Sequence, residues 1–282
     1  MNPPHHLNTR IQGTGFPMLC LHGHPGSGKT MSVFTERLSQ HYQTIAPDLR
    51  GYGQSRTSQP FAMTDHLADL LHLMDAQAVE SCIVLGWSLG GILAMELALS
   101  APDRVAGLIL LATAAHPKGA HPAVSWQDNA TTAIAALANQ VWVGAPWLIE
   151  TFGKRSLFRY LVQQHTPQVY HRLATEAVEA YLNTSPHATE ALQTALRQGY
   201  NNLSAIQSIT SPVLMLAAEN DVHITAASSL ETAKQLQQSQ TRCYAEAAHL
   251  FPWEISDQVL QDIEKWLSET FPVAQSENKA QP

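Results

Sequence analysis

The sequence predicts an α/β fold: a mostly parallel, twisted sheet with helices on both faces and an inserted helical cap. Short apolar runs alternate with amphipathic helical segments, which is the pattern of strands joined by helical crossovers. The 282 residues are 45% hydrophobic and only 14% charged, enough apolar material for one well-buried core. We expect one domain over residues 1–272 and a disordered tail over residues 273–282, which are polar and lack periodicity.

Six short apolar runs are the expected strands, at residues 16–21, 43–46, 81–85, 105–112, 213–217 and 242–245. Helices are expected between them, at residues 30–40, after Thr64 and at residues 89–100, with a last helix after Ser256. Thr64 and Ser256 are expected as N-caps, because their hydroxyls accept bonds from first-turn amides. Since parallel strands need crossovers, this order favours a parallel sheet.

Residues 116–203 interrupt the alternation with helical rather than strand signals. A crossover between parallel strands needs only about a dozen residues, so this insertion forms structure of its own. We expect a helical cap over the carboxyl ends of the strands. The insertion is rich in large aromatic residues, most of which we expect to pack the cap: Trp126, Trp142, Trp147, Phe152, Phe158, Tyr160, Tyr170 and Tyr181.

Composition excludes several classes of protein. The net charge of −7 provides no basic stripe for a nucleic-acid backbone. No apolar run approaches the roughly 18 residues that span a bilayer, and the N-terminus lacks the apolar stretch of a secretion signal. Cys20, Cys82 and Cys243 are odd in number and lie in apolar runs, so we interpret them as buried thiols in a reducing compartment. A cytoplasmic protein is expected, and nothing indicates its oligomeric state.

Residues 86–90 read GWSLG and fit the G-x-S-x-G nucleophile elbow. In such an elbow the serine sits on a strained turn between a strand and a helix, with its hydroxyl exposed. The flanking glycines let the helix approach the strand closely. An expected strand precedes the motif and an expected helix follows it. Ser88 is therefore the candidate nucleophile.

A neutral serine hydroxyl needs a base within hydrogen-bond reach, and the fourteen histidines of the chain make composition alone uninformative. In an open α/β sheet, however, chemistry gathers at the carboxyl ends of the strands. His249 follows the last expected strand, and Asp221 follows the fifth. The chain order Ser, Asp, His is the order that accompanies this elbow. We predict Ser88 as nucleophile, His249 as base and Asp221 as the acid that orients the imidazole.

Stabilising the oxyanion requires two further donors. The amide of Leu89, at the start of a helix, is one candidate, and the amide of His24, in the HGHPG loop of residues 22–26, is the other. Losing such a donor typically costs about 3 kcal/mol of transition-state stabilisation. This scheme requires no metal and no organic cofactor, and its expected partner is a small ester-like substrate. The expected pocket walls are Trp87, Trp142, Trp147 and Phe251.

Four motifs in order resemble those of the α/β-hydrolase superfamily, over nearly the whole chain. They are the HGHPG loop, DLRGYGQS at residues 48–55, the elbow followed by a second glycine, and His249 with Glu254 five residues later. The sequence of the elbow, GWSLGG, is similar to that of the pimeloyl-carrier-protein methyl ester esterases. The resemblance implies the α/β-hydrolase fold, a carboxylesterase-like activity through an acyl-enzyme, and a scaffold role for Asp48 and Arg50.

The sequence departs from the family pattern at three positions near the predicted triad. Ala218 and Ala248 replace the glycines usual before the acid and the histidine, and Thr225 stands where a proline often follows the acid. These changes make the subfamily harder to assign, but they leave the three predicted triad residues in place. Serine rather than aspartate in the elbow argues against the related epoxide hydrolases and haloalkane dehalogenases. Proline iminopeptidases have a similar loop but usually a different elbow.

Three alternatives stay open. The same triad could serve lactone opening, carbon–carbon bond hydrolysis or cofactor-free peroxidase chemistry, or the chain could be a silent binding protein. The third is a nucleotide binder, since Gly23 to Thr30 also satisfy the P-loop pattern G-x-x-x-x-G-K-[ST]. A working P-loop also needs a second apolar strand that ends in an acidic residue, which serves the metal. The candidate strand that ends at Asp48 is better explained as part of the DLRGYGQS segment. We expect Lys29 to be a solvated residue of the first helical turn.

Overall fold

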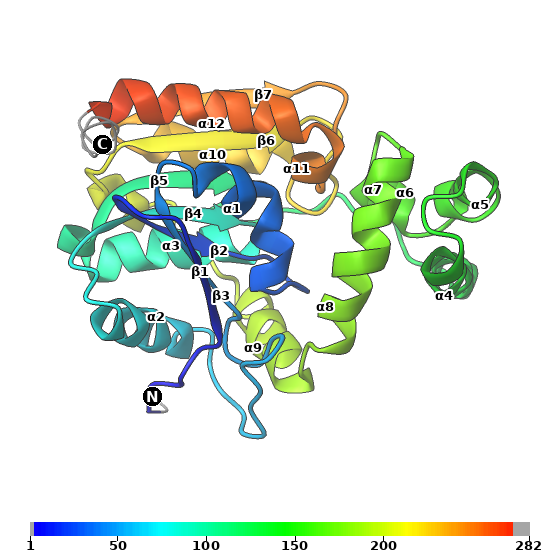
Figure 1. The fold of residues 1–282 in the computed structure, drawn as a ribbon, viewed down its shortest axis with the longest axis horizontal. Coiled ribbons are helices and arrows are strands. Elements are labelled where there is room, and N and C mark those ends of the chain that lie inside the picture. The colour runs from blue at the N-terminus through cyan, green and yellow to red at the C-terminus, as the bar shows by residue number, and fades with distance from the viewer. Residues whose placement is uncertain (1–2, 273–282) are drawn as a thin grey trace.

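The structure, a computed structural model, describes residues 3–272 and is built around one seven-stranded sheet (Figure 1). The strand order is β1-β3-β2-β4-β5-β6-β7, with β1 antiparallel to β3 and the other neighbours parallel. This is the mostly parallel sheet predicted from the sequence. The predicted tail at residues 273–282 lies outside the described residues.

The elements have these bounds. The strands are β1 (Thr9–Gln12), β2 (Pro17–Leu21), β3 (Gln43–Pro47), β4 (Cys82–Trp87), β5 (Val105–Leu111), β6 (Val213–Ala218) and β7 (Ser239–Tyr244). The helices outside the insertion are α1 (Ser32–Leu38), α2 (Asp65–Ala76), α3 (Leu89–Ser100), α10 (Ala226–Gln235), α11 (Phe251–Glu254) and α12 (Ser256–Thr270), with the 3-10 turn η1 (Gly28–Met31). The helices of the insertion are α4 (Trp126–Val141), α5 (Pro146–Thr151), α6 (Phe158–Leu161), α7 (Pro167–Arg172), the π-helical η4 (Leu173–Ala177), α8 (Val178–Leu182) and α9 (Pro186–Arg197).

The central strands are buried on both faces, which explains their continuous apolar runs. Along β2, Met18 and Cys20 face the core under α1 and α12, whereas Leu19 and Leu21 face the core under α2 and α3. Helices therefore cover the sheet on both sides (Figure 1). The predicted layers are those observed, and the carboxyl ends of the parallel strands all meet one edge of the sheet.

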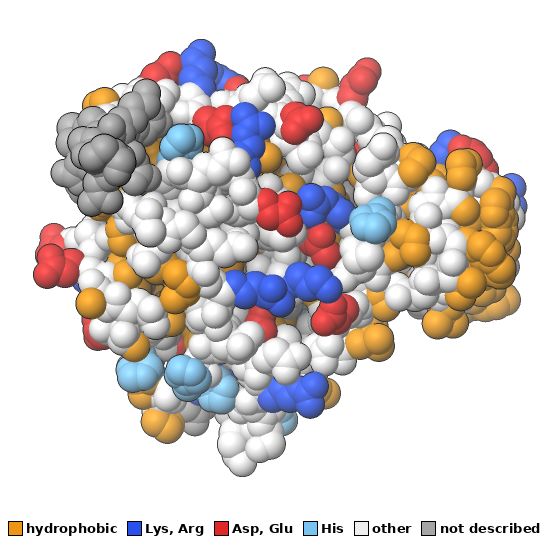
Figure 2. Space-filling model, in the orientation of Figure 1, with side chains coloured by type: hydrophobic (Ala, Val, Ile, Leu, Met, Phe, Trp, Pro, Cys, Tyr) orange, Lys and Arg blue, Asp and Glu red, His pale blue; other side chains and the backbone are white. Residues whose placement is uncertain are grey.

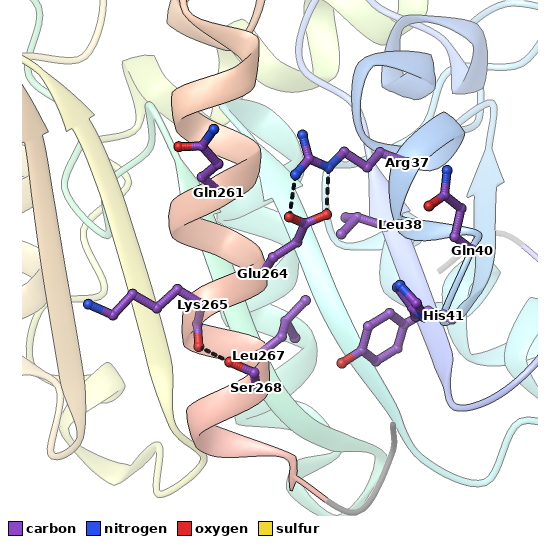
Figure 3. A pocket seen from close by; sticks show the side chains of 10 residues that line it. Arg37, Leu38, Gln40, His41, Gln261, Glu264, Lys265, Leu267 and Ser268 are labelled. Carbon is purple, nitrogen blue, oxygen red and sulfur yellow. Dashed lines mark hydrogen bonds and ion pairs between the residues drawn. The ribbon is translucent and has the colours of Figure 1, made fainter. Parts of the chain in front are cut away.

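Helices α1 and α12 lie side by side on one face, and an ion pair joins them (Figure 3). Arg37 donates two hydrogen bonds to Glu264, from Nε to Oε1 at 2.6 Å and from Nη2 to Oε2 at 2.5 Å. Bidentate pairs of this kind fix geometry as well as adding energy. The surface hollow of about 710 Å³ around this pair is lined only by α1, the turn after it and α12. This hollow is therefore separate from the strand ends.

The described segment between β5 and β6 consists of helices and connecting loops, without a strand. Helices α4 to α8 lie beyond the carboxyl ends of the strands (Figure 1, green), while α9 returns to the core through Ala188 and Leu192. The described part of the insertion is helical, as expected, and its proposed limits at residues 116 and 203 stay a prediction. No helix within residues 3–272 combines the length and the apolar character needed to cross a bilayer.

Thr64 takes the predicted N-cap position without the expected capping bond, and the prediction for Ser256 is wrong. Thr64 is the residue before α2, but its backbone is already helical and its hydroxyl makes no capping bond. Instead Asp65 Oδ2 accepts the amide of Ala62 at 3.0 Å. Ser256 is the first residue of α12 rather than its cap, and Ile255 precedes the helix. Both differences arise because a capping residue type does not reveal its own backbone angles.

Predictions at the two edge strands of the sheet were also wrong. Strand β1 was not expected, because its side chains are mostly exposed and no apolar run marks it; it exists through its antiparallel pairing with β3. Cys243 lies on the edge strand β7 and is exposed, which contradicts the predicted buried thiol. Cys20 and Cys82 are buried as predicted, and burial raises the pKa of both thiols.

Stability should depend on the buried ion pair between Arg50 and Asp69, whose side chains are 5% and 1% exposed. Arg50 Nε donates to Asp69 Oδ2 at 2.8 Å. The variant Asp69→Ala leaves the guanidinium buried and unpaired, so the free energy of unfolding should fall by about 3–5 kcal/mol in urea denaturation. The control Glu269→Ala, on the exposed end of α12, should cost less than about 1 kcal/mol. Equal losses in the two variants would contradict the scaffold role of Arg50.

Candidate active site

Ser88 lies on a strained turn between β4 and α3, with φ of 55° and ψ of −115°. Such angles are unusual for a residue with a side chain and are typical of a nucleophile elbow. A Cβ on Gly86 would lie 2.4 Å from the carbonyl oxygen of Gly90, and one on Gly90 only 2.1 Å from that of Leu21. The Ser88 amide donates to the carbonyl of Leu111 at 2.8 Å. The two glycines and this bond therefore hold Ser88 at the sheet edge.

Asp221 and His249 form a buried hydrogen-bonded pair at the same edge. Asp221 Oδ2 accepts from His249 Nδ1 at 2.7 Å, and Oδ1 accepts the amides of His223 and Ile224 at 2.8 and 3.0 Å. Because Nδ1 must carry its proton to donate to the carboxylate, the neutral ring has its lone pair on Nε2. The pair thus presents the tautomer that a general base requires.

Trp87 connects the elbow to the histidine loop. Its indole nitrogen donates to the carbonyl oxygen of His249 at 3.3 Å, and its ring packs edge-on against Trp253 at 5.4 Å between centroids. Within residues 3–272 no hydrogen bond joins the hydroxyl of Ser88 to His249. In unliganded enzymes this contact is often long and tightens when substrate binds.

The two predicted oxyanion donors lie in segments adjacent to Ser88. Leu89 is the first residue of α3, where an amide has no acceptor within the helix. His24 follows Gly23, and a Cβ on Gly23 would lie 3.1 Å from Cβ of Ser88, so this loop lies against the elbow. Neither the Leu89 nor the His24 amide donates to another group of the described chain. Both amides are therefore available to a ligand oxygen.

The DLRGYGQS segment contacts the loop of residues 22–28, in keeping with the predicted scaffold role of Asp48, while the part played by Tyr52 was not predicted. Asp48 Oδ1 accepts the amide of Gly28 at 2.7 Å. The hydroxyl of Tyr52, which is fully buried, lies 2.9 Å from His24 Nδ1. Motif spacing alone could not identify Tyr52, because its partner lies in a different loop. The His24 side chain thus has a structural contact of its own.

His22 is a second buried link between these loops. Its Nδ1 donates to the carbonyl of Gly23 at 2.8 Å, and its Nε2 accepts the amide of Leu49 at 3.0 Å. Burial lowers the pKa of His22 to about 4. Because Nε2 accepts an amide hydrogen, only the neutral ring satisfies both bonds.

Glu254, the last motif residue, joins the histidine loop to the cap. Its carboxylate accepts the amide of Ala248 at 2.9 Å, immediately before His249. The same group accepts the amides of Gln163 and Gln164, between α6 and α7, at 2.7 and 2.5 Å. Burial raises the pKa of Glu254. The resemblance identified Glu254 but not this contact, since its partners are remote in sequence.

A cavity of about 800 Å³ lies beside Ser88, between the sheet edge and the cap. Trp87 contributes to its wall, but three other predicted wall residues do not. Trp142 and Trp147 pack against each other on the outside of the cap, where they are 53% and 52% exposed. Phe251 is wholly buried in the core. Aromatic content indicated a cap, but it did not indicate which side of each helix faces the core.

The groups that a P-loop would offer to phosphate are already engaged. Asp48 occupies one loop amide, as described above, and the hydroxyl of Thr30 donates to a loop carbonyl at 2.7 Å. Lys29 donates to the carbonyl of Thr175 at 3.0 Å and to Glu179 at 2.6 Å. The nucleotide-binding alternative is therefore not supported. Lys29 lies in the first helical turn with a side chain that is 39% exposed, as predicted, and it also links η1 to the cap.

The family model described as alpha/beta hydrolase fold matches residues 17–254. The chain belongs to this family, and the predicted fold class and family resemblance are confirmed. The enol-lactonase from Burkholderia xenovorans has a similar fold, with a TM-score of 0.72, 18% identity, and coverage of 93% of this chain and 96% of that one.

Relatives of similar sequence are named pimeloyl-[acyl-carrier protein] methyl ester esterases. The protein from Aliivibrio salmonicida is 38% identical over 107 residues, which is 38% of this chain and 40% of that relative. The protein from Vibrio campbellii is 27% identical over 251 residues, 86% of this chain and 91% of the relative. The stronger similarity thus spans less than half of the relative concerned, and the weaker one spans nearly all of it.

The link through Glu254 should be visible in amide exchange. In Glu254→Ala, the amides of Ala248, Gln163 and Gln164 lose their acceptor, and each such bond contributes about 1 kcal/mol. Their exchange should therefore accelerate about fivefold, as measured by hydrogen–deuterium exchange with mass spectrometry. The control Glu246→Ala removes an exposed carboxylate from the same loop and should leave these rates unchanged. Unaltered exchange in Glu254→Ala would refute the link.

Acidification should destabilise the fold through His22. Its pKa is about 4 in the folded chain against 6.5 unperturbed, so the unfolded state binds more protons between these values. The stabilisation present above pH 6.5 should therefore be lost as the pH falls towards 4, by on the order of 3 kcal/mol. Denaturation across this range should show a shallower slope in His22→Gln than in the exposed control His41→Gln. Identical slopes would rule out His22 as the source.

Proposed function

We propose that this protein is a serine hydrolase that cleaves a carboxylic ester through an acyl-enzyme intermediate. Ser88 is the nucleophile, His249 the general base and Asp221 the orienting acid. The observation that carries this proposal is the 2.7 Å bond between Asp221 and His249, at the sheet edge where the strained elbow holds Ser88. The names of the esterase relatives favour an ester as the bond cleaved.

The reaction proceeds in two halves. His249 Nε2 accepts the proton of Ser88 as Oγ attacks the ester carbonyl, and Asp221 stabilises the imidazolium. The amides of His24 and Leu89 donate to the oxyanion of the tetrahedral intermediate. The C–O bond to the alcohol then breaks, and the alcohol takes the proton from His249. A water molecule, deprotonated by the same nitrogen, attacks the acyl carbon and releases the acid and free Ser88.

Lactone opening, carbon–carbon bond hydrolysis and peroxidase chemistry would use the same three residues, and the esterase relatives favour none of them. The proposed partner is a small ester-like molecule. A reducing compartment such as the cytoplasm fits the three free cysteines, two of them buried.

A fluorophosphonate probe tests the nucleophile directly. It should add its mass to the peptide that contains Ser88 in the wild type and in the control Ser268→Ala, but not in Ser88→Ala. Turnover of an ester should fall by about four or more orders of magnitude in Ser88→Ala, judging by other triads. Retention of turnover within about tenfold of wild type, or labelling at another residue, would show that Ser88 is not the nucleophile.

A further inference from the structure

The cavity beside Ser88 has walls without charge. No Asp, Glu, Lys or Arg stands among the described residues that line it. Its cap side is mostly aliphatic, with Ala136, Leu137, Leu161, Leu173, Val178 and Leu182 among its residues, and its polar members, Asn129 and Thr132, are uncharged. Among the described lining residues His24 is the one histidine, and burial lowers its pKa, which favours the neutral ring. An apolar cavity of about 800 Å³ is large enough to enclose a small organic molecule.

The charged side chains of α4, α6, η4 and α8 are paired outside this lining. Lys29 pairs with Glu179 at 2.6 Å. Arg159 pairs with Asp128 at 2.7 Å and Arg172 with Glu176 at 2.8 Å. A charged group in the cavity would therefore find no counter-ion on the wall, and burying an unpaired charge is costly. The cavity should reject a substrate chain that carries a carboxylate.

The outer rim of the cavity is also apolar. Leu137 on α4 and Tyr181 and Leu182 on α8 line the cavity, yet they are 71%, 69% and 74% exposed. The cavity thus reaches the surface of the cap between these two helices. Figure 2 shows hydrophobic side chains gathered on the cap end of the molecule. A chain longer than the cavity could leave along this rim and remain in apolar contact.

We propose that the substrate is an ester of an uncharged aliphatic acid, whose acyl chain lies in this cavity and, when long, emerges between α4 and α8. This inference rests on the proposed function. The acyl group is assigned to the cavity because it stays bonded to Ser88 Oγ while the alcohol leaves and water enters. An enclosed apolar space suits the group that remains, whereas a small alcohol must depart before water attacks.

Steady-state hydrolysis of methyl esters tests the preference for an uncharged aliphatic acyl chain. Between methyl butyrate and methyl octanoate, kcat/KM should rise by at least about tenfold, since each buried methylene can contribute about fourfold. Monomethyl suberate has the same chain length with a terminal carboxylate, and its kcat/KM should be about a hundredfold below that of methyl octanoate. Dimethyl suberate, which is uncharged, should recover most of this loss. A flat chain-length profile, or equal hydrolysis of the charged ester, would overturn the proposal.

Two tryptophan variants on α4 test whether the acyl chain of the substrate lies in the cavity. Ala136→Trp fills the cavity and should lower kcat/KM for methyl octanoate by about tenfold or more while sparing methyl acetate. The control Ile134→Trp lies on the same helix, is 47% exposed and does not line the cavity, so both esters should be unaffected. Equal effects of Ala136→Trp on the two esters, in a protein with unchanged Tm, would count against this location.

Fluorophosphonate labelling separates this inference from the proposed function. A labelled Ser88 without the chain-length and charge preferences would overturn the acyl chain proposal alone. An unlabelled Ser88 would overturn the proposed function, and with it the substrate. Binding gives an independent reading: Ser88→Ala should show a higher Tm with methyl octanoate than with monomethyl suberate. Equal stabilisation by the two esters would contradict the uncharged cavity.

Discussion

The close approach of α3 to the sheet is the constraint on which the site depends. Gly90 lies so near the carbonyl oxygen of Leu21 that no side chain fits between them, and a side chain on Gly86 would likewise meet the carbonyl oxygen of Gly90. This approach forces Ser88 into a left-handed conformation at the strand end. The same approach places the first amide of α3 beside Ser88, so one packing contact positions both the proposed nucleophile and a proposed oxyanion donor.

Two sets of buried polar contacts hold the other groups against this elbow. On one side His22 and Tyr52 join the HGHPG loop, the proposed oxyanion loop, to the segment after β3. On the other side Glu254 joins the loop of His249 to the cap. Buried polar groups must be paired, so these contacts restrict both loops to a narrow set of positions. The cap therefore helps to position the imidazole as well as enclosing the cavity.

The parts predicted correctly were those with a local signal. The bounds of α3 agree with the prediction, because a motif marks its start and Pro102 follows its end. The strand ends and the chain order were enough to predict that Asp221 and His249 lie together, and their roles as acid and base stay a prediction. Strand β1 depends on β3, a partner remote in sequence, so periodicity could not reveal it. The outward orientation of Trp142 was missed because aromatic content does not show which side of a helix is exposed. The contacts of Glu254 were missed for the same reason.

The P-loop pattern shows that a sequence can match one motif because the packing of a different fold requires the same residues. A Cβ on Gly26 would lie 2.5 Å from the carbonyl oxygen of Gly23, and one on Gly28 would lie 2.4 Å from that of Ala46. These glycines are therefore required by packing against the neighbouring backbone. Lys29 serves the cap through Glu179, although a P-loop lysine would serve a phosphate. Gly28, Lys29 and Thr30 each have a partner within the chain, and the loop lies beside Ser88.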